Sequence, residues 1–176
     1  HLYLLRGETG RAEVEARAAV DARDDLPEAH FMLGLCYERQ DERKKAETAY
    51  RQGAKLAPEN PVFPRALAIL CEGQARWKDA IKMYERVVEL SEGSADALID
   101  LGLAQFDGRK HEDAVRSFEI VLKLDPKNLT ALLNLGVLHQ HHEKDRKNAA
   151  QYYREYLDNG GTDVRVRDWL AEVEGR

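Results

Sequence analysis

The segment AHFMLGLCY at residues 29–37 returns two periods of 34 residues later as ALIDLGLAQ at residues 97–105. The same period connects four small residues, each of which is preceded by leucine. They are Gly34, Ala68, Gly102 and Gly136. Self-similarity at a fixed period of this size is the signature of a repeat architecture, in which one supersecondary unit stacks on the next. The sequence therefore predicts an array of short repeats.

Two further markers keep the same phase along the chain. An alanine follows twelve residues after each small residue, with the last one arriving one residue late: Ala46, Ala80, Ala114 and Ala149. Four residues beyond each alanine stands an aromatic side chain: Tyr50, Tyr84, Phe118 and Tyr153. Proline closes two of the repeats, at Pro58 and Pro126. One such coincidence would be weak evidence, but four in phase indicate a genuine repeat.

Each repeat contains two amphipathic segments, such as 27–40 and 43–55, joined by a short polar turn. Apolar residues recur in both segments at helical spacing, so each repeat is predicted to be a hairpin of two helices. We expect Gly34 and Ala46 to lie where the two helices approach most closely. We expect Tyr50 to fill the gap between one hairpin and the next.

Capping residues predict where the first helices begin. Asn60, Ser94 and Asn128 stand just ahead of the first helix of the following repeat, where a side-chain oxygen can accept a hydrogen bond from a backbone N–H. Pro61 follows the first of them. We expect this proline in the first turn of its helix, where its missing N–H costs little.

The patterns AHFMLGLCY…A…Y…P over residues 29–58 and ALIDLGLAQ…A…F…P over residues 97–126 resemble the tetratricopeptide repeat (TPR) family. The resemblance spans nearly the whole chain and is to the bacterial type. It implies an all-α fold, a right-handed α-solenoid of antiparallel helix hairpins with a C-terminal capping helix. The implied organisation is a partial first repeat at 1–26, repeats at 27–60, 61–94, 95–128 and 129–163, the last with a one-residue insertion, and a capping helix at 164–176.

A few residues depart from the family pattern. Pro64 stands where a large apolar residue is usual, Glu92 stands where proline is usual, and Gly53 replaces an alanine. These departures leave the local geometry open without changing the expected fold. The capping helix is expected to turn four apolar residues inward, namely Val166, Trp169, Leu170 and Val173.

Composition excludes several classes of partner. The chain has 176 residues, a formal net charge of −5 and charges of both signs along its length. Nucleic-acid binding requires a basic face, so DNA and RNA are not expected as partners. No apolar run approaches the roughly 20 residues that span a bilayer, so direct membrane insertion is not expected. Cys36 and Cys71 are interpreted as small buried hydrophobic residues.

The chain begins at His1 and not at Met, and we expect it to be a fragment of something longer. A removed leader or anchor is compatible with this start. The sequence therefore leaves open whether this is a cytoplasmic or a periplasmic soluble domain.

The resemblance implies that the first helix of each repeat lines a concave groove, which takes an extended peptide or a helix of another protein. The groove-facing positions of the family are here Phe31, Leu35, Glu38, Arg39, Arg65, Ile69, Glu72, Ile99, Leu103, Phe106, Leu133, Val137 and His141. They form a largely apolar stripe, and an exposed apolar patch usually marks a partner surface. We predict a scaffold or adaptor that binds an apolar or amphipathic segment. The alternative is that part of this stripe simply packs between neighbouring first helices.

Other functions follow less directly from these residues. A carboxylate clamp of the kind used by chaperone-binding relatives is not predicted, because Arg65 and Asn134 are isolated among apolar residues. The chain could instead be the substrate-docking or regulatory arm of a larger enzyme. It could also be a self-assembling scaffold, a homo-oligomer in a bacterial surface or organelle assembly.

Catalysis and cofactors are not predicted. The sequence has no G-x-S-x-G, no H-E-x-x-H and no phosphate-binding glycine loop. Glu38 and Glu72 could approach each other on adjacent helices, but we interpret them as solvated residues of a helix face. The chain is therefore predicted not to be an enzyme and to need no cofactor.

The run HQHHE at residues 139–143 holds three of the six histidines. His139 is interpreted as a half-buried packing residue, and His141 as a groove residue. His139 and His142 lie three residues apart on a helix and could share a metal ion weakly. A structural zinc site requires four ligands, however, so no metal is predicted.

Overall fold

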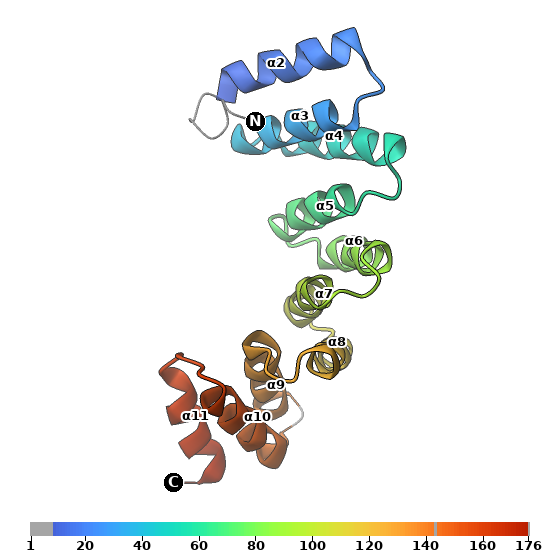
Figure 1. Ribbon diagram of the computed structural model, residues 1–176. Coiled ribbons are helices and arrows are strands. Elements are labelled where there is room, and N and C mark those ends of the chain that lie inside the picture. Colours follow the sequence, from blue (N-terminus) through green and yellow to red (C-terminus); the bar gives the residue numbers. More distant parts are fainter. Residues whose placement is uncertain (1–8, 143, 176) are drawn as a thin grey trace. The chain divides into compact units, whose positions relative to one another are not determined.

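A computed structural model describes residues 9–142 and 144–175 of the chain. This described part consists of ten α-helices, labelled α2 to α11, and contains no strand (Figure 1). The all-α fold predicted from the repeats is therefore confirmed. The chain divides into two compact units, of which unit 1 ends at Ser91 and unit 2 begins at Glu92. The expected first-helix end before Thr9, and Glu143 of the histidine run, lie outside the described residues.

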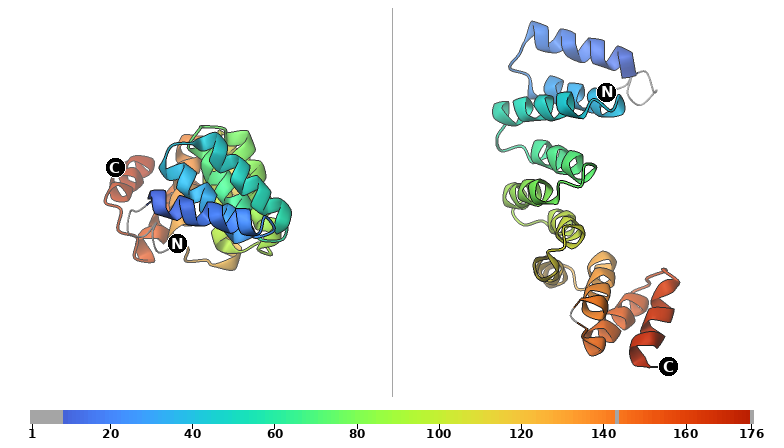
Figure 2. Two further views of the ribbon diagram at one scale, coloured as in Figure 1. Left: turned by 90° about the horizontal axis from the view of Figure 1, so that it is seen from above. Right: turned by 180° about the vertical axis from the view of Figure 1, so that it is seen from behind.

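Within its described residues, unit 1 contains a single helix followed by two hairpins. Its helices are α2 (Thr9–Ala22), α3 (Pro27–Arg39), α4 (Arg43–Leu56), α5 (Val62–Glu72) and α6 (Trp77–Leu90). The pairs α3–α4 and α5–α6 form the hairpins, whereas α2 packs on α3 and α4 packs on α5. In the right view of Figure 2, α2 lies on one side of the α3–α4 hairpin and α5 lies on the other. The chain within unit 1 is thus a stack of helices in sequence order.

Unit 2 has two hairpins followed by a single helix. Its helices are α7 (Ala95–Asp107), α8 (His111–Leu124), α9 (Leu129–His141), α10 (Arg146–Asp158) and α11 (Arg165–Glu174). The pairs α7–α8 and α9–α10 form the hairpins, α8 packs on α9, and α11 packs on α10. Val166 and Val173 of α11 are buried, and Trp169 and Leu170 pack beside them. The last helix therefore presents its apolar face to α10.

A buried aromatic ring lies on a glycine inside each of three hairpins. Tyr50 covers Gly34, Phe118 covers Gly102 and Tyr153 covers Gly136, so closely that a Cβ at any of these glycines would overlap the ring. The three rings are fully buried. The Tyr50 ring lies on Gly34 of its own hairpin and also belongs to the core cluster that contains Leu67 and Leu70 of the next hairpin. Only glycine leaves room for a ring at this distance from a helix backbone.

Two of the three predicted caps form as expected. The side chains of Ser94 and Asn128 accept hydrogen bonds from backbone N–H groups three residues later, at 3.3 Å and 3.0 Å. Asn60 instead accepts from Val62 N, two residues later, at 3.1 Å. The helix α5 begins at Val62, so Pro61 immediately precedes the helix and does not lie in its first turn as predicted. The short Asn60 turn uses the first free N–H group and moves the helix start by one residue.

The one-residue insertion of the last repeat precedes a helix cap that was not predicted from the sequence. Asp145 precedes α10 and accepts a hydrogen bond from Asn148 N at 3.1 Å, while the Asn148 side chain donates to the same carboxylate at 2.8 Å. The extra residue lies in the turn before this cap. This cap stabilises the first turn of α10. The ring of Tyr153 therefore lies on Gly136, although Tyr153 stands one residue later in its repeat than Tyr50 does in its own.

Candidate functional site

The thirteen residues predicted to line a groove all lie on the first helices of the hairpins. Within unit 1 they lie on α3 and α5, and within unit 2 on α7 and α9. The ring of Phe31 on α3 packs edge-on against Phe63 of α5, with 5.9 Å between the ring centroids. This contact makes α3 and α5 neighbours. We call the predicted residues of α3 and α5 the unit 1 face, and those of α7 and α9 the unit 2 face.

The residues of the unit 1 face differ in exposure. Ile69 is 51% exposed, the highest exposure among the apolar residues of this face. Phe31 and Leu35 are half-buried and pack against the core of the hairpins. Arg39 is exposed and Arg65 is half-buried. Ile69 is thus the exposed apolar residue of this face, whereas Phe31 and Leu35 contribute to packing within unit 1.

Glu38 and Glu72 are tied to tyrosines of their own hairpins. The hydroxyl of Tyr84 donates a hydrogen bond of 3.0 Å to Glu72, and the hydroxyl of Tyr50 donates to Glu38. Both glutamates are half-buried. Burial of the phenol, reinforced by the bond to Glu38, raises the pKa of Tyr50 far above its ordinary value. The interpretation of these carboxylates as solvated is therefore corrected, because each accepts a hydrogen bond from a buried phenol.

The unit 2 face repeats this gradation of exposure. Leu103 is 37% exposed, whereas Ile99, Leu133 and Val137 are half-buried. His141 is exposed. An open leucine in the middle of α7 therefore corresponds to the open isoleucine of α5, 34 residues earlier.

Phe106 belongs to an aromatic cluster at the end of the unit 2 face. The rings of His111 on α8 and His142 after α9 stack with 3.5 Å between their centroids. Phe106 packs edge-on against both, at 5.8 Å and 6.0 Å. Burial, and then the neighbouring imidazoles of His111 and His141, lower the pKa of His142. Sequence reasoning missed His111, because it lies in a different hairpin from the run HQHHE.

His139 and His142 of the histidine run have ring partners. His139 is 6% exposed and its ring stacks on Tyr152, with 5.4 Å between centroids. The packing role predicted for His139 is confirmed, with deeper burial than expected. His142 stacks on His111, so the two histidines proposed to share a metal have different ring partners. Across residues 9–142 and 144–175, no group of three or more His, Cys, Asp or Glu residues is placed to hold a metal ion.

The two cysteines are buried and lie in different helices. Burial raises the pKa of both the Cys36 and the Cys71 thiol, which keeps them in the unreactive neutral form. The interpretation of both as small core residues is confirmed. None of the described helices combines the length and the apolarity that a membrane span requires.

Tetratricopeptide repeat models match most of the chain, one at residues 65–115 and 99–164 and another at residues 27–60. The chain belongs to the tetratricopeptide repeat family. This TPR chain is 24% identical over 110 residues to tetratricopeptide repeat protein 8 of Caenorhabditis elegans, a match that covers 62% of this chain and 22% of that protein. The TPR chain thus spans about a fifth of the length of this curated relative.

Solved TPR structures are similar over most of the chain. PilF of Pseudomonas aeruginosa has a TM-score of 0.74 at 24% identity and covers 97% of this chain and 83% of its own. YrrB, a TPR protein with an unusual peptide-binding site, has a TM-score of 0.78 at 20% identity, with coverage of 99% and 88%. MamA has a TM-score of 0.79 at 19% identity, with coverage of 89% and 91%. At these identities the likeness shows the shared helical-solenoid fold.

Family and fold together define the general role of the chain. It is a helical-repeat protein of the class that forms protein-binding scaffolds. Solenoids of this kind present rows of equivalent helix surfaces, because each repeat contacts only its neighbours and leaves one face open. In the TPR chain, the open apolar side chains Ile69 and Leu103 lie at equivalent points of two first helices.

Proposed function

We propose that the TPR chain is a non-catalytic adaptor that binds an apolar or amphipathic peptide or helix of another protein on the faces of its first helices. The observation that carries this proposal is the exposure of Ile69, at 51%, on the unit 1 face. A large apolar side chain held open on a helix surface is stabilised when a partner covers it. Leu103, at 37%, offers the same opportunity on the unit 2 face.

The charged residues of the unit 1 face suit a peptide with apolar anchors and some polar character. Arg65 lies one helical turn before Ile69, and Arg39 lies at the exposed end of α3. The unit 1 face therefore combines one open apolar side chain with two guanidinium groups. An amphipathic segment that places an apolar residue on Ile69 and a carboxylate nearby would match this arrangement. Glu38 and Glu72 support the face through their tyrosines and need not contact the partner.

Affinity capture with matched variants tests this proposal. The double substitution Ile69→Glu and Leu103→Glu replaces the exposed apolar side chain of each face with a negative charge. The control is Ile120→Glu, since Ile120 is 42% exposed but lies on α8, a second helix. We expect the paired variant to lose the partners that the unchanged chain captures, and the control to keep them. Equal capture by all three folded proteins would refute binding through the first-helix faces.

The remaining alternatives lead to different results in simple measurements. If the chain is a docking arm of a larger enzyme, the captured partners are substrates of a catalytic domain on the same polypeptide. If it is a self-assembling scaffold, sedimentation velocity shows a mass that rises with protein concentration, and the paired Glu substitutions change this behaviour. An adaptor sediments as a monomer until its partner is added.

A further inference from the structure

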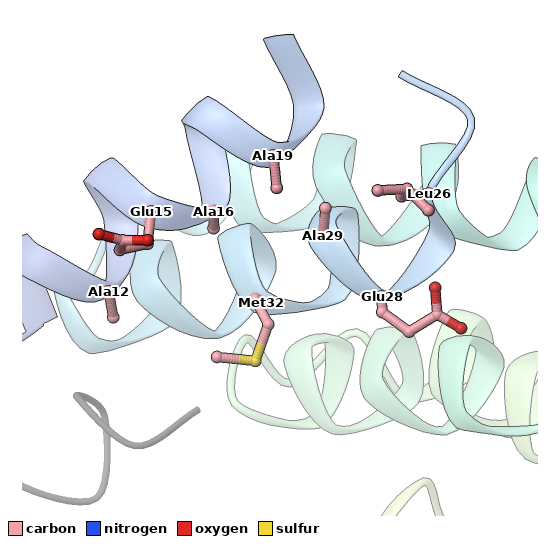
Figure 3. Close-up of a pocket in the computed structure, with 8 residues that line it drawn as sticks. All are labelled: Ala12, Glu15, Ala16, Ala19, Leu26, Glu28, Ala29 and Met32. Carbon is pink, nitrogen blue, oxygen red and sulfur yellow. The ribbon is translucent and has the colours of Figure 1, made fainter. Parts of the chain in front are cut away.

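A hollow of about 340 Å³ lies between α2 and α3 of unit 1 (Figure 3). Its walls are mostly small side chains, and the alanines Ala16 and Ala29 are themselves buried, at 7% exposure each. The chain ahead of Thr9 lies outside the described residues, so no described element shows what covers this side of α2. The hollow is therefore assigned no ligand or partner.

Three aromatic rings of unit 2 form a cluster that joins two hairpins. His111 is the first residue of α8, and His142 directly follows α9. Their imidazole planes lie within 20° of each other, with 3.5 Å between the centroids. Phe106 of α7 packs against both imidazoles at steep angles, 71° to His111 and 87° to His142. Two titratable rings therefore lie against one apolar side chain.

Phe106 is also the last apolar residue of α7 on the unit 2 face. It follows Leu103 by three residues, so the two side chains share one side of the helix. Leu103 is 37% exposed, whereas Phe106 is half-buried. The two imidazoles contribute to the burial of Phe106, because both rings contact it. Withdrawal of one imidazole would extend the exposed apolar surface from Leu103 to Phe106.

The stack depends on the protonation of its imidazoles, since two imidazolium rings at this separation repel each other strongly. Burial, followed by the imidazoles of His111 and His141, lowers the pKa of His142. The stack is therefore complete above the ordinary pKa of about 6.5 and loses stability as pH falls through the lower folded pKa. His142 is the ring that can leave, because it is exposed and follows the last residue of α9, whereas His111 lies in the first turn of α8.

The charged groups next to the three rings along the chain come from α7, α8, α9 and the turns between them. They are Asp107, Arg109, Lys110, Glu112, Asp113, His141, Lys144 and Asp145. Asp113 accepts a hydrogen bond from Arg116, and Asp145 accepts two from Asn148. Carboxylates ordinarily titrate near pH 4, and Lys and Arg above pH 10, so histidine is the residue type that changes charge between pH 7 and pH 5. Glu143 lies outside the described residues, and its charge is removed by substitution in the experiment.

We propose that the stacked imidazoles of His111 and His142 are a proton-sensitive cover on Phe106, which opens in mildly acidic solution and adds Phe106 to the exposed apolar surface of the unit 2 face. Phe106 then joins Leu103 as a contact for an apolar segment of another protein. Binding to the unit 2 face is accordingly stronger at pH 5.5 than at pH 7.5. This regulation rests on the proposed function of the first-helix faces.

Fluorine NMR measures the opening without any partner. The protein carries 4-fluorophenylalanine at its four phenylalanines, and Phe106→Leu assigns the Phe106 signal. We expect this signal to move toward its position in the urea-unfolded protein as pH falls from 7.5 to 5.5. His142→Phe, or His111→Phe if the first variant does not fold, keeps an uncharged ring in the stack and should hold the signal in place. Glu143→Gln should leave the movement unchanged.

Three results of this measurement overturn the cover. They are a Phe106 signal that does not move in the unchanged chain, an equal movement in His142→Phe, and a loss of the movement in Glu143→Gln. Circular dichroism checks that each variant stays folded between pH 7.5 and pH 5.5. A signal that moves only while His111 and His142 are both present supports the proposal.

Binding is measured with Nile red, an uncharged apolar dye, so that acid does not change the charge of the probe. We expect the unchanged chain to bind the dye about fivefold more tightly at pH 5.5 than at pH 7.5, because Phe106 adds apolar area to the surface. His142→Ala removes the cover and should bind tightly at both pH values, whereas His142→Phe should bind weakly at both. Leu103→Glu should remove most of the gain, since it places a charge beside Phe106.

A dye affinity that does not change with pH in the unchanged chain overturns the regulation of the unit 2 face. The proposed function fails separately, when the Ile69→Glu and Leu103→Glu protein captures the same partners as the unchanged chain. The movement of the Phe106 signal is measured without a partner, so that result leaves it unaffected.

Discussion

The hydroxyl of Tyr84 donates a 3.0 Å hydrogen bond to Glu72, twelve residues earlier, and so connects the end of α5 to the middle of α6. The same spacing connects Tyr50 to Glu38, and Tyr153 donates to Gln140 at 2.7 Å across the hairpin with the insertion. The remaining hairpin has Phe118 in place of tyrosine. There Ser117 donates to Gln105 at 2.7 Å instead. A buried or partly buried hydrogen bond between the two helices is thus a recurring part of the hairpin.

Removing the Tyr84 hydroxyl should weaken the hairpin. We expect Tyr84→Phe to lower the free energy of unfolding by about 1 kcal/mol, the usual net value of a partly buried hydrogen bond. Urea denaturation measures the difference. Glu85→Gln, an exposed neighbour on the same helix, should stay within about 0.5 kcal/mol of the unchanged chain. A Tyr84→Phe protein as stable as this control would show that the bond contributes nothing.

Alkaline pH should destabilise the protein through Tyr50. Its folded pKa lies above that of an unfolded tyrosine, about 10. The stabilisation is therefore complete below about pH 10 and is lost as pH rises above that value, because the unfolded chain then releases a proton that the folded chain retains. Unfolding free energies measured from pH 8 to pH 11 should fall more steeply for the unchanged chain than for Tyr50→Phe. Parallel curves would contradict the burial of this phenol.

The glycines beneath the rings should not tolerate even one methyl group. In an open helix, Gly→Ala stabilises by up to about 1 kcal/mol. At Gly34 the new Cβ would overlap the Tyr50 ring, so we expect Gly34→Ala to destabilise by about 1–3 kcal/mol. Gly10 of α2 is the matched control, since nothing lies within 4 Å of a Cβ there. Thermal unfolding should move in opposite directions for the two variants, and a shared direction would refute the packing of Tyr50 on Gly34.

Acid should loosen the histidine stack of unit 2. The folded pKa of His142 lies below its ordinary value of 6.5, so the stack contributes stability above that pH and loses it as pH falls through the folded pKa. His142→Phe keeps a ring on His111 but carries no charge. We expect its stability to change less between pH 7 and pH 5 than that of the unchanged chain. His141→Gln, at the exposed neighbouring position, should retain most of the pH dependence.

The open apolar residues should contribute modestly and separately to partner binding. Truncation of Ile69 to alanine removes apolar area that a partner would cover, worth about 1 kcal/mol, or roughly a fivefold change in affinity. We expect Ile120→Ala on α8 to leave the affinity unchanged. Isothermal titration with the captured partner measures both. An Ile120→Ala effect as large as that of Ile69→Ala would place the binding surface on the second helices.

The helical hairpins could be predicted from the sequence because their signals are local and periodic. The 34-residue period, the helical spacing of apolar residues and the caps Ser94 and Asn128 each act over a few residues, and all of them correspond to observed helices. Pro61 was placed one residue too far into its helix, because the side chain of Asn60 offered a choice between two nearby N–H groups. Such a choice depends on local geometry that residue type alone does not specify.

By itself, the sequence determined the repeat, the all-α class and the family of this protein, since these depend on a pattern that four hairpins restate. Only the tertiary structure decided which side chains remain open. It showed that Glu38 and Glu72 accept bonds from buried phenols, that His142 stacks on His111 of another hairpin, and that Ile69 stays exposed where Phe31 does not. It also revealed the hollow beside Ala16. The physical reason is that burial and pairing depend on contacts between helices that are distant in sequence, whereas helix formation depends mainly on neighbours along the chain.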